Sequence, residues 1–367
     1  MAALTTIGKR SWLRTATAAV MILVCAVALG VGFVAQAQQP RERGGERSRS
    51  AEPREERAPL PEGSVTLRYR FDEQAEPERF RLVEEARETT EDRGREMTQQ
   101  RRTELIYTQR IEEVDEAKET AWLALTYERI RYRQQSTLNP TPLSFDSAAG
   151  EPPLDPALRP YAHLAGQTVR IRLGSDGVVH AVEGYSELLD EIFAELEEKP
   201  FAHLRQLLEQ QFSNEAMRAS LTRLYAVLPS RPVEPGDYWE QQLEQPVAFA
   251  GTLHSQTRYT LRRFEHDEGG RAVAVLGIET EYHQRRGEED ERQTLEVVPG
   301  VAGNATLEDG SMRGSVRLDL ATGHVTASEL EQNMALHFHA EDTAHRGAVV
   351  DVRSTTEATI RLERLAE

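Results

Sequence analysis

The feature that most constrains the fold is an alternation of apolar and polar residues along much of the chain. Near the C-terminus, Val350, Val352, Ala358, Ile360 and Leu362 all lie at positions of the same parity, with charged residues between them. A period of two places the apolar residues on one face of a strand and the charged residues on the other. This pattern predicts a mainly β protein whose antiparallel sheet has one wet face.

The same alternation predicts strands on both sides of a central block. Before the block, we expect strands at residues 65–72, 97–113 and 120–134. After it, we expect strands at residues 238–243, 252–264, 272–282, 294–298, 314–320, 325–339 and 350–362. Residues 84–95 are strongly charged, and residues 139–160 are rich in proline. We expect residues 84–95 to form a loop or a short helix, and residues 139–160 to form a loop.

Residues 166–239 interrupt the β pattern. They open with a hairpin around Gly174-Ser-Asp-Gly177, a turn sequence that reverses a strand. Three amphipathic helices are expected next, each with apolar residues at helical spacing. The first begins at an N-cap Ser186 and reaches Leu196, the second begins at Pro200, and the third follows an N-cap Ser213 and reaches Leu228.

A repeated motif relates the two β regions. The sequence Tyr107-Thr-x-Arg110 with later acidic residues recurs as Tyr259-Thr-x-Arg262, and each copy precedes an apolar strand. Two readings stay open: a duplicated β-meander, or independent use of common hairpin residues. With a duplication, the chain predicts an α+β, mainly β fold. In this fold about three helices cover the concave face of a long, curved, half-barrel-like antiparallel sheet.

The chain divides into an export signal, a linker and a domain. Residues 1–37 have basic residues ahead of an apolar run that ends in Ala35-Gln36-Ala37, which predicts a signal peptide. An uncleaved membrane anchor is the alternative. Residues 38–61 mix both charges with Pro and Gly and predict a disordered linker. The remainder is one expected α+β domain, divided into a first meander at 62–165, the hairpin and helices at 166–239 and a second meander at 240–367.

Composition narrows the function. The single cysteine, Cys25, lies within the predicted signal, so the mature chain is expected to have no disulfide, no thiol nucleophile and no cysteine-bound metal. The net charge of −17 disfavours nucleic acid as a partner. The sequence contains no phosphate-binding loop or dinucleotide fingerprint, and we expect no cofactor. After signal cleavage we expect no stable membrane span, and the oligomeric state stays open.

Several turn motifs carry a family resemblance. They include Phe145-Asp-Ser147 before a Pro-rich loop, Val182-Glu-Gly184, and Pro232-Val-x-Pro-Gly-Asp-x-Trp239. With the Gly174–Gly177 turn, they resemble an uncharacterised domain family of exported bacterial envelope proteins, over most of the chain from Val65 onward. The resemblance implies no activity. The expected architecture is also loosely similar to the half-barrel of periplasmic lipoprotein carriers, in which the space between sheet and helices binds acyl chains.

Two candidate chemistries can be read from polar clusters. His337 and His339 share one face of a predicted strand, with His345 nearby, which is a spacing that metal sites use. Solvated histidines at a strand end are the simpler interpretation. Asp146-Ser147 offers a nucleophile, but no Gly-x-Ser-x-Gly elbow surrounds Ser147, and a side-chain-capped turn is favoured. We therefore expect no catalytic residues.

Three functions remain open. The first is a non-enzymatic protein of the cell envelope, exported to the periplasm or the exterior. It binds an apolar or amphipathic ligand, such as a lipid or a lipidated partner, between sheet and helices. The second is an acidic interaction or scaffold domain with a packed core, and the third is a hydrolase or metal enzyme. The first predicts a cavity lined by Trp122, Ile192, Phe193, Leu221 and Tyr225.

Overall fold

A computed structural model gives the arrangement of most of the predicted domain. It describes residues 58–366 except for 139–140, 151–157, 195–212, 223–224, 248–250, 286–294, 299–300 and 343–348. The predicted signal peptide and most of the predicted linker therefore lie outside the described residues.

One antiparallel sheet of 13 strands dominates the molecule, with the order β6-β5-β3-β2-β1-β13-β12-β11-β9-β8-β7, while β4 pairs with β3 and β10 with β11. The strands of its first half are β1 (Glu78–Asp92), β2 (Arg95–Asp115), β3 (Thr120–Ser136), β4 (Leu143–Asp146), β5 (Thr168–Gly174) and β6 (Val179–Glu183). Those of its second half are β7 (Tyr238–Val247), β8 (Gly251–His266), β9 (Ala272–Arg285), β10 (Leu295–Val298), β11 (Val301–Asp319), β12 (Val325–Asp342) and β13 (Val349–Arg364).

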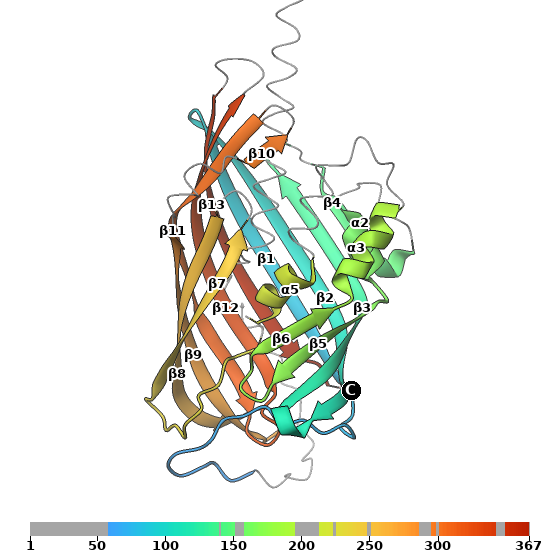
Figure 1. The fold of residues 1–367 in the computed structure, drawn as a ribbon, viewed down its shortest axis with the longest axis vertical. Helices are drawn as coiled ribbons and strands as arrows, with labels where there is room; N and C mark the ends of the chain where they lie inside the picture. Colours follow the sequence, from blue (N-terminus) through green and yellow to red (C-terminus); the bar gives the residue numbers. More distant parts are fainter. Residues whose placement is uncertain are drawn as a thin grey trace, which may run out of the picture.

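The sheet curves into a half-barrel (Figure 1). Its path through the described strands ends at β6 on one side and at β7 on the other, so the sheet is not closed. The right-handed twist of neighbouring strands produces this curvature when strands are long, and β2 alone has 21 residues. The predicted mainly β fold with a long curved antiparallel sheet is confirmed.

The two halves of the sheet follow the same path. In the first half, β1, β2, β3, β5 and β6 are neighbours in chain order, and in the second half β7, β8, β9, β11 and β12 are. The repeated motif places Tyr107 on β2 and Tyr259 on β8, at equivalent points of this path. β13 then pairs with β1 and joins the halves. A duplicated meander and independent use of hairpin residues both give this strand order.

Three strand predictions were wrong. Residues 84–95 do not form a loop or helix but most of β1 and its turn, because pairing with β2 and β13 holds this charged segment extended. Residues 65–72 keep alternating burial, but their only ladder contact is an isolated bridge between Val65 and Val233. β11 begins at Val301, well before the expected start at residue 314.

The helical block differs from the prediction. α3 (Tyr185–Ala194) corresponds to the first expected helix, and the second lies largely in residues 195–212, outside the described residues. The third is shorter than expected: α5 (Asn214–Leu221) ends where Thr222 Oγ1 donates a hydrogen bond to the Arg218 carbonyl. α2 (Arg159–Leu164) begins at the end of the expected loop, with Pro160 in its first turn, and continues beyond it. A three-helix block that covers the whole concave face is therefore not found in the described residues.

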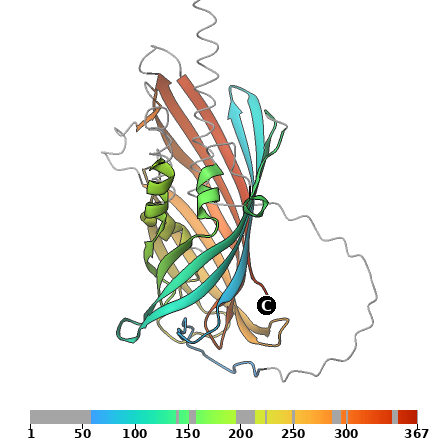
Figure 2. The same cartoon turned by 90° about the vertical axis from the view of Figure 1, so that its right-hand side faces the viewer.

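The described helices gather at one side of the sheet. α2 lies against β3, α5 lies against β6, and α3 contacts both of these helices. Figure 1 shows α2 and α3 beside β3 and β4, and Figure 2 shows the curved sheet with its helices turned by 90°. None of the helices in the described ranges is long and apolar enough to cross a membrane.

The N-termini of α3 and α5 cap each other. Asn214 Oδ1 accepts hydrogen bonds from the Tyr185 and Ser186 backbone N–H groups, and Ser186 Oγ accepts one from Asn214 N. These contacts satisfy N–H groups that have no partner within a helix. Ser186 was expected to cap its own helix, but its hydroxyl serves the other one.

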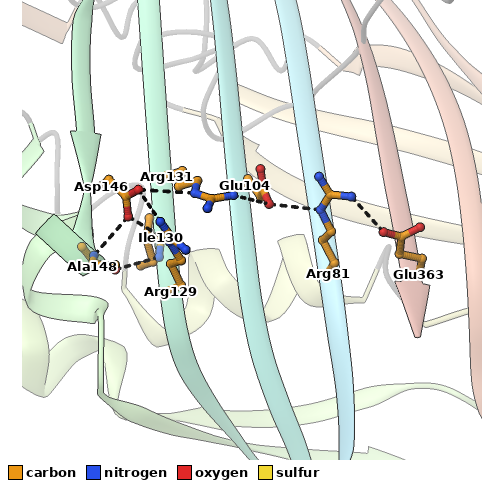
Figure 3. Close-up of polar contacts among 9 residues, drawn as sticks. Arg81, Glu104, Arg129, Ile130, Arg131, Asp146, Ala148 and Glu363 are labelled. Carbon is orange, nitrogen blue, oxygen red and sulfur yellow. Dashed lines mark hydrogen bonds and ion pairs between the residues drawn. The ribbon is translucent and has the colours of Figure 1, made fainter. Parts of the chain in front are cut away.

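Ion pairs cross the outer face of the sheet. Arg131 bonds to Asp146 at 3.4 Å and to Glu104 at 3.1 Å, Glu104 also accepts from Arg81 at 3.1 Å, and Arg81 reaches Glu363 at 3.1 Å. This chain of charges runs from β4 to β13 over five strands (Figure 3). The convex side is therefore the wet face, and the apolar residues point into the half-barrel.

Candidate functional site: the concave face of the sheet

Two strands carry a broad apolar surface on the concave face. Positions of one parity on β12 point inward, and the cross-strand register aligns them with inward positions of β11. We call this surface the apolar wall; its members are buried and are Ala305, Met312, Leu330, Met334, Leu336 and Phe338.

Polar side chains adjoin the apolar wall on the same face. On β1 the inward positions change from Phe80 and Leu82 to Glu84 and Glu88, and inward positions on β2 and β13 are polar as well. We call this cluster the inner polar patch; its members are Glu84, Glu88, Arg101, Thr103, Gln332 and Ser354, each at most 7 % exposed. Patch and wall meet where Ser354 is the cross-strand partner of Leu336.

An ion pair lies at the centre of the patch. Arg101 Nη2 donates to Glu84 Oε1 at 2.9 Å, and Ser354 Oγ donates to Glu88 Oε1 at 2.8 Å. Burial raises the pKa of Glu84 to about 7, although Arg101 and Thr103 act in the opposite direction. Removing charged groups from water costs several kcal/mol for each ion. Such clusters are therefore concentrated at functional sites.

α2 borders this patch. Its Tyr161 ring packs against Tyr132 of β3, with ring centroids 5.3 Å apart. Burial raises the pKa of Tyr161, and the charges of Arg101 and Glu84 also act on it. The phenol therefore stays neutral and offers a hydroxyl beside the patch.

Tyrosines fill the interior near the β5–β6 and β11–β12 turns. Tyr225 donates a hydrogen bond to Gln109 Oε1 at 2.8 Å, and the hydroxyls of Tyr127 and Tyr185 are in direct contact. Burial is the main cause that raises the pKa values of Tyr225, Tyr127 and Tyr185. A cavity of about 20 Å³ beside Tyr225 and Gln109 has room for about one water molecule.

The structure brings four of the five predicted lining residues together. Ile192, Phe193, Leu221 and Tyr225 are buried in the main apolar core. Trp122 is half-buried beside Leu123 on β3, so it lies on the opposite, outer face. There the Arg170 guanidinium stacks over its ring at 4.7 Å, and Trp122 is separated from the other four residues.

The histidine candidates lie on the outer face. His337 Nε2 is 2.6 Å from Asp351 Oδ1, and His339 Nδ1 is 3.9 Å from the other oxygen of the same carboxylate. The hydrogen bond from His337 lowers the pKa of Asp351. His345 lies outside the described residues. The described residues contain no group of three or more His, Cys, Asp or Glu in a metal-binding arrangement.

Asp146 and Ser147 form the capped turn that was predicted. Asp146 accepts a hydrogen bond from Ala148 N at 3.0 Å and pairs with Arg129, and Ser147 Oγ accepts one from Ile130 N at 3.0 Å. The two arginines beside Asp146, Arg129 first, lower its pKa to about 2. These contacts anchor the turn to β3.

Sequence reasoning missed the inner polar patch. Glu84 and Glu88 lie in the charged stretch that was expected to be a loop, and nothing local distinguishes them from the outward Glu85. A possible signal was that both lie an even number of residues after Phe80, which continues the inward parity of β1. Only the pairing of β1 with β2 and β13 determines which carboxylates point inward.

Several solved structures match this chain at low identity. The structure titled "Lipid-protein interactions in lipovitellin" has a TM-score of 0.37 at 9% identity and covers 79% of this chain, which spans 25% of the lipovitellin chain. The β-domain of a Bordetella autotransporter has a TM-score of 0.20 at 8% identity, with 78% and 98% of the two chains covered. An outer-membrane channel from Pseudomonas putida F1 also has 0.20 at 8%, with 86% and 100% covered.

Among curated proteins, the comparison found no match. A family model does match the sequence. It aligns with residues 118–325, which is more than half of the 367 residues. The chain therefore belongs to a family of unknown function (DUF6263).

Proposed function

We propose that this chain is a non-enzymatic protein of the cell envelope that holds an amphipathic ligand, a lipid or a lipidated partner, against its concave face. The observation that supports this proposal is the junction of the apolar wall and the inner polar patch on one curved face. The export signal predicted at residues 1–37 supports the location.

The apolar wall suits the hydrocarbon part of such a ligand. Its side chains present only carbon and sulfur atoms, and burial of apolar area is the main favourable term in binding. Among the described elements, the strongest contacts between α-helices and the sheet are those of α5 with β6 and of α2 with β3.

The inner polar patch suits the polar end of the same ligand. Glu84, Glu88 and Arg101 supply charges of both signs, while Ser354 and Gln332 supply a hydroxyl and an amide. In a low-dielectric interior, hydrogen bonds to charged groups are stronger than in water and fix orientation. Because Leu336 adjoins Ser354, a molecule that touches both surfaces spans an apolar and a polar contact at once.

Native mass spectrometry of the mature protein, gently extracted and then reloaded with palmitate after delipidation, tests the proposal. Leu336→Gln places an amide in the apolar wall and is expected to reduce palmitate binding about tenfold, because burying a leucine contributes about 1.5–3 kcal/mol. Ala335→Gln, on the outward position beside it, is the control and is expected to bind as the wild type does.

Circular dichroism of both variants distinguishes lost binding from lost folding. A wild-type protein that carries no lipid from its source and takes up no palmitate contradicts the proposal. Equal binding by folded Leu336→Gln and Ala335→Gln variants places the ligand elsewhere and also contradicts it.

A packed interaction domain is the second candidate. The side chains of Ile192, Phe193, Leu221 and Tyr225 pack into the main core, and the cavity next to them holds only about one water. The outer face carries charge pairs over many strands, and the chain has a net charge of −17. A folded protein without bound lipid that captures a basic partner favours this function.

A further inference from the structure

One end of the half-barrel is crossed by an extended segment, residues 65–71, which we call the strap. Val65 exchanges two backbone hydrogen bonds with Val233, at 2.8 and 2.9 Å. Further along, Tyr69 N donates to the Ser175 carbonyl at 2.9 Å, and Arg70 N donates to the Thr322 carbonyl at 2.8 Å. The strap therefore connects the β5–β6 turn to the β11–β12 turn, which belong to the two halves of the open sheet.

The strap seals the interior at this end. Leu67 and Tyr69 point inward and are 2 % and 3 % exposed. Tyr69 also lines the small cavity next to Tyr225 and Gln109. Displacing the strap therefore opens the interior from this end.

His324 links the strap to β1 through its two ring nitrogens. Nε2 lies 3.0 Å from the Arg70 carbonyl oxygen, and Nδ1 lies 2.8 Å from Glu78 Oε2. A carbonyl oxygen and a carboxylate oxygen only accept hydrogen bonds, so both contacts form only when both nitrogens carry a proton. A neutral imidazole has one N–H group, and one of the two contacts is then lost.

Other charged and titratable groups surround this ring. Arg364 of β13 also bonds to Glu78, and Asp319 at the end of β11 lies 3.9 Å from both Arg364 and Arg271. The Tyr69 ring stacks on His324 with centroids 6.5 Å apart.

The balance of these groups favours the cation. Burial acts to lower the pKa of His324, but the hydrogen bond and charge of Glu78, the Arg70 carbonyl and the charge of Asp319 outweigh it and raise the pKa above the usual 6.5. A raised histidine pKa means that the stabilisation is complete below pH 6.5 and is lost as the pH rises through the folded-state value.

We propose that the strap is a pH-dependent closure: protonated His324 fastens residues 65–71 across this end of the half-barrel, and deprotonation releases them and opens the interior. The closure itself stands on the contacts of His324. Its role in admitting a ligand rests on the function proposed above.

Hydrogen exchange at residues 65–71, corrected for the intrinsic pH dependence of amide exchange, tests the closure. Between pH 6 and pH 9, the protection of these amides is expected to fall about tenfold or more in the wild type, because a hydrogen bond to a charged group is lost. His324→Gln does not titrate and is expected to show no step. His283→Gln, which replaces an exposed histidine on β9, is expected to show the same fall in protection as the wild type. Constant protection in the wild type, or a step that survives in His324→Gln, overturns the proposal.

A reversible lock tests the link to the ligand. Val65 and Val233 form a hydrogen-bonded antiparallel pair, whose Cα separation of about 5.5 Å suits a disulfide. In Val65→Cys/Val233→Cys, we expect palmitate uptake at pH 9 to be slow when oxidised and to recover on reduction. Equal uptake in both forms overturns the gating role. No palmitate binding at any pH refutes the proposed function instead, and the exchange step still decides the closure.

Discussion

At the scale of single residues, the β5–β6 turn and the β11–β12 turn each contain a glycine that has a structural reason. Gly177 follows β5 and Gly323 follows β11, and both have positive φ values, of 84° and 75°. A Cβ atom at Gly323 would lie 1.9 Å from the Arg68 carbonyl oxygen in the strap, and one at Gly177 would lie 2.2 Å from the Ala226 carbonyl oxygen. The two turns therefore require glycine for conformation and for space.

Gly323→Ala is expected to destabilise the protein by about 2–4 kcal/mol, because a left-handed alanine costs about 1–2 kcal/mol and the contact with Arg68 adds to it. Gly94→Ala is a matched control with the same φ of 75° and nothing within 4 Å of the added Cβ. Urea unfolding of both variants measures the difference. Equal losses of unfolding free energy in the two variants would show that the contact between the added Cβ and the Arg68 carbonyl oxygen contributes nothing.

Glu84 predicts a pH effect on stability. The pKa of Glu84 rises from 4.5 to about 7 on folding. The contribution of this group to the free energy of unfolding is therefore complete below pH 4.5 and is lost as the pH rises through 7. Glu84→Gln removes this titration, and the decline of unfolding free energy between pH 4.5 and 8 is expected to shrink by up to about 3 kcal/mol. Glu357→Gln, at an exposed glutamate on β13, serves as the control. A decline that is unchanged in Glu84→Gln contradicts the buried titration.

At the scale of elements, apolar alternation was a good guide and charge was a poor one. β2 and β3 lie within two residues of their predicted bounds because their apolar positions recur every second residue. β1 was missed because most of its outward positions and half of its inward ones are charged, and pairing on both sides compensates for that composition. α2 was missed because it begins in the last two residues of a Pro-rich stretch that was expected to be a loop, although proline is compatible with a first helical turn.

The outer ion pairs contribute to the stability of these strands. Glu104 accepts from both Arg81 and Arg131, and its side chain is only 9% exposed, so Glu104→Gln is expected to lower the unfolding free energy by about 1 kcal/mol. Glu363→Gln, at the 53% exposed end of the same chain of charges, is expected to cost less. Urea denaturation at low salt and at high salt measures the loss of unfolding free energy in each variant. Equal losses in Glu104→Gln and Glu363→Gln would contradict the role of burial.

At the scale of the whole molecule, two similar meanders form one sheet. The first runs from β1 to β6 and the second from β7 to β12, and β13 pairs with β1 to join them. The strap then bridges equivalent turns of the two meanders at one end. This arrangement leaves β6 and β7 apart, so the half-barrel is open at its side while its strap end is closed.

The sequence by itself determined the mainly β class, the inward parity of most long strands and the repeated motif, because these depend on local periodicity and turn chemistry. The tertiary structure decided which carboxylates are buried, since strand pairing sets the face of Glu84 and Glu88. It also decided that residues 65–71 form a strap and not a sheet strand. Contacts between residues far apart in the chain make these choices, and no local pattern encodes them.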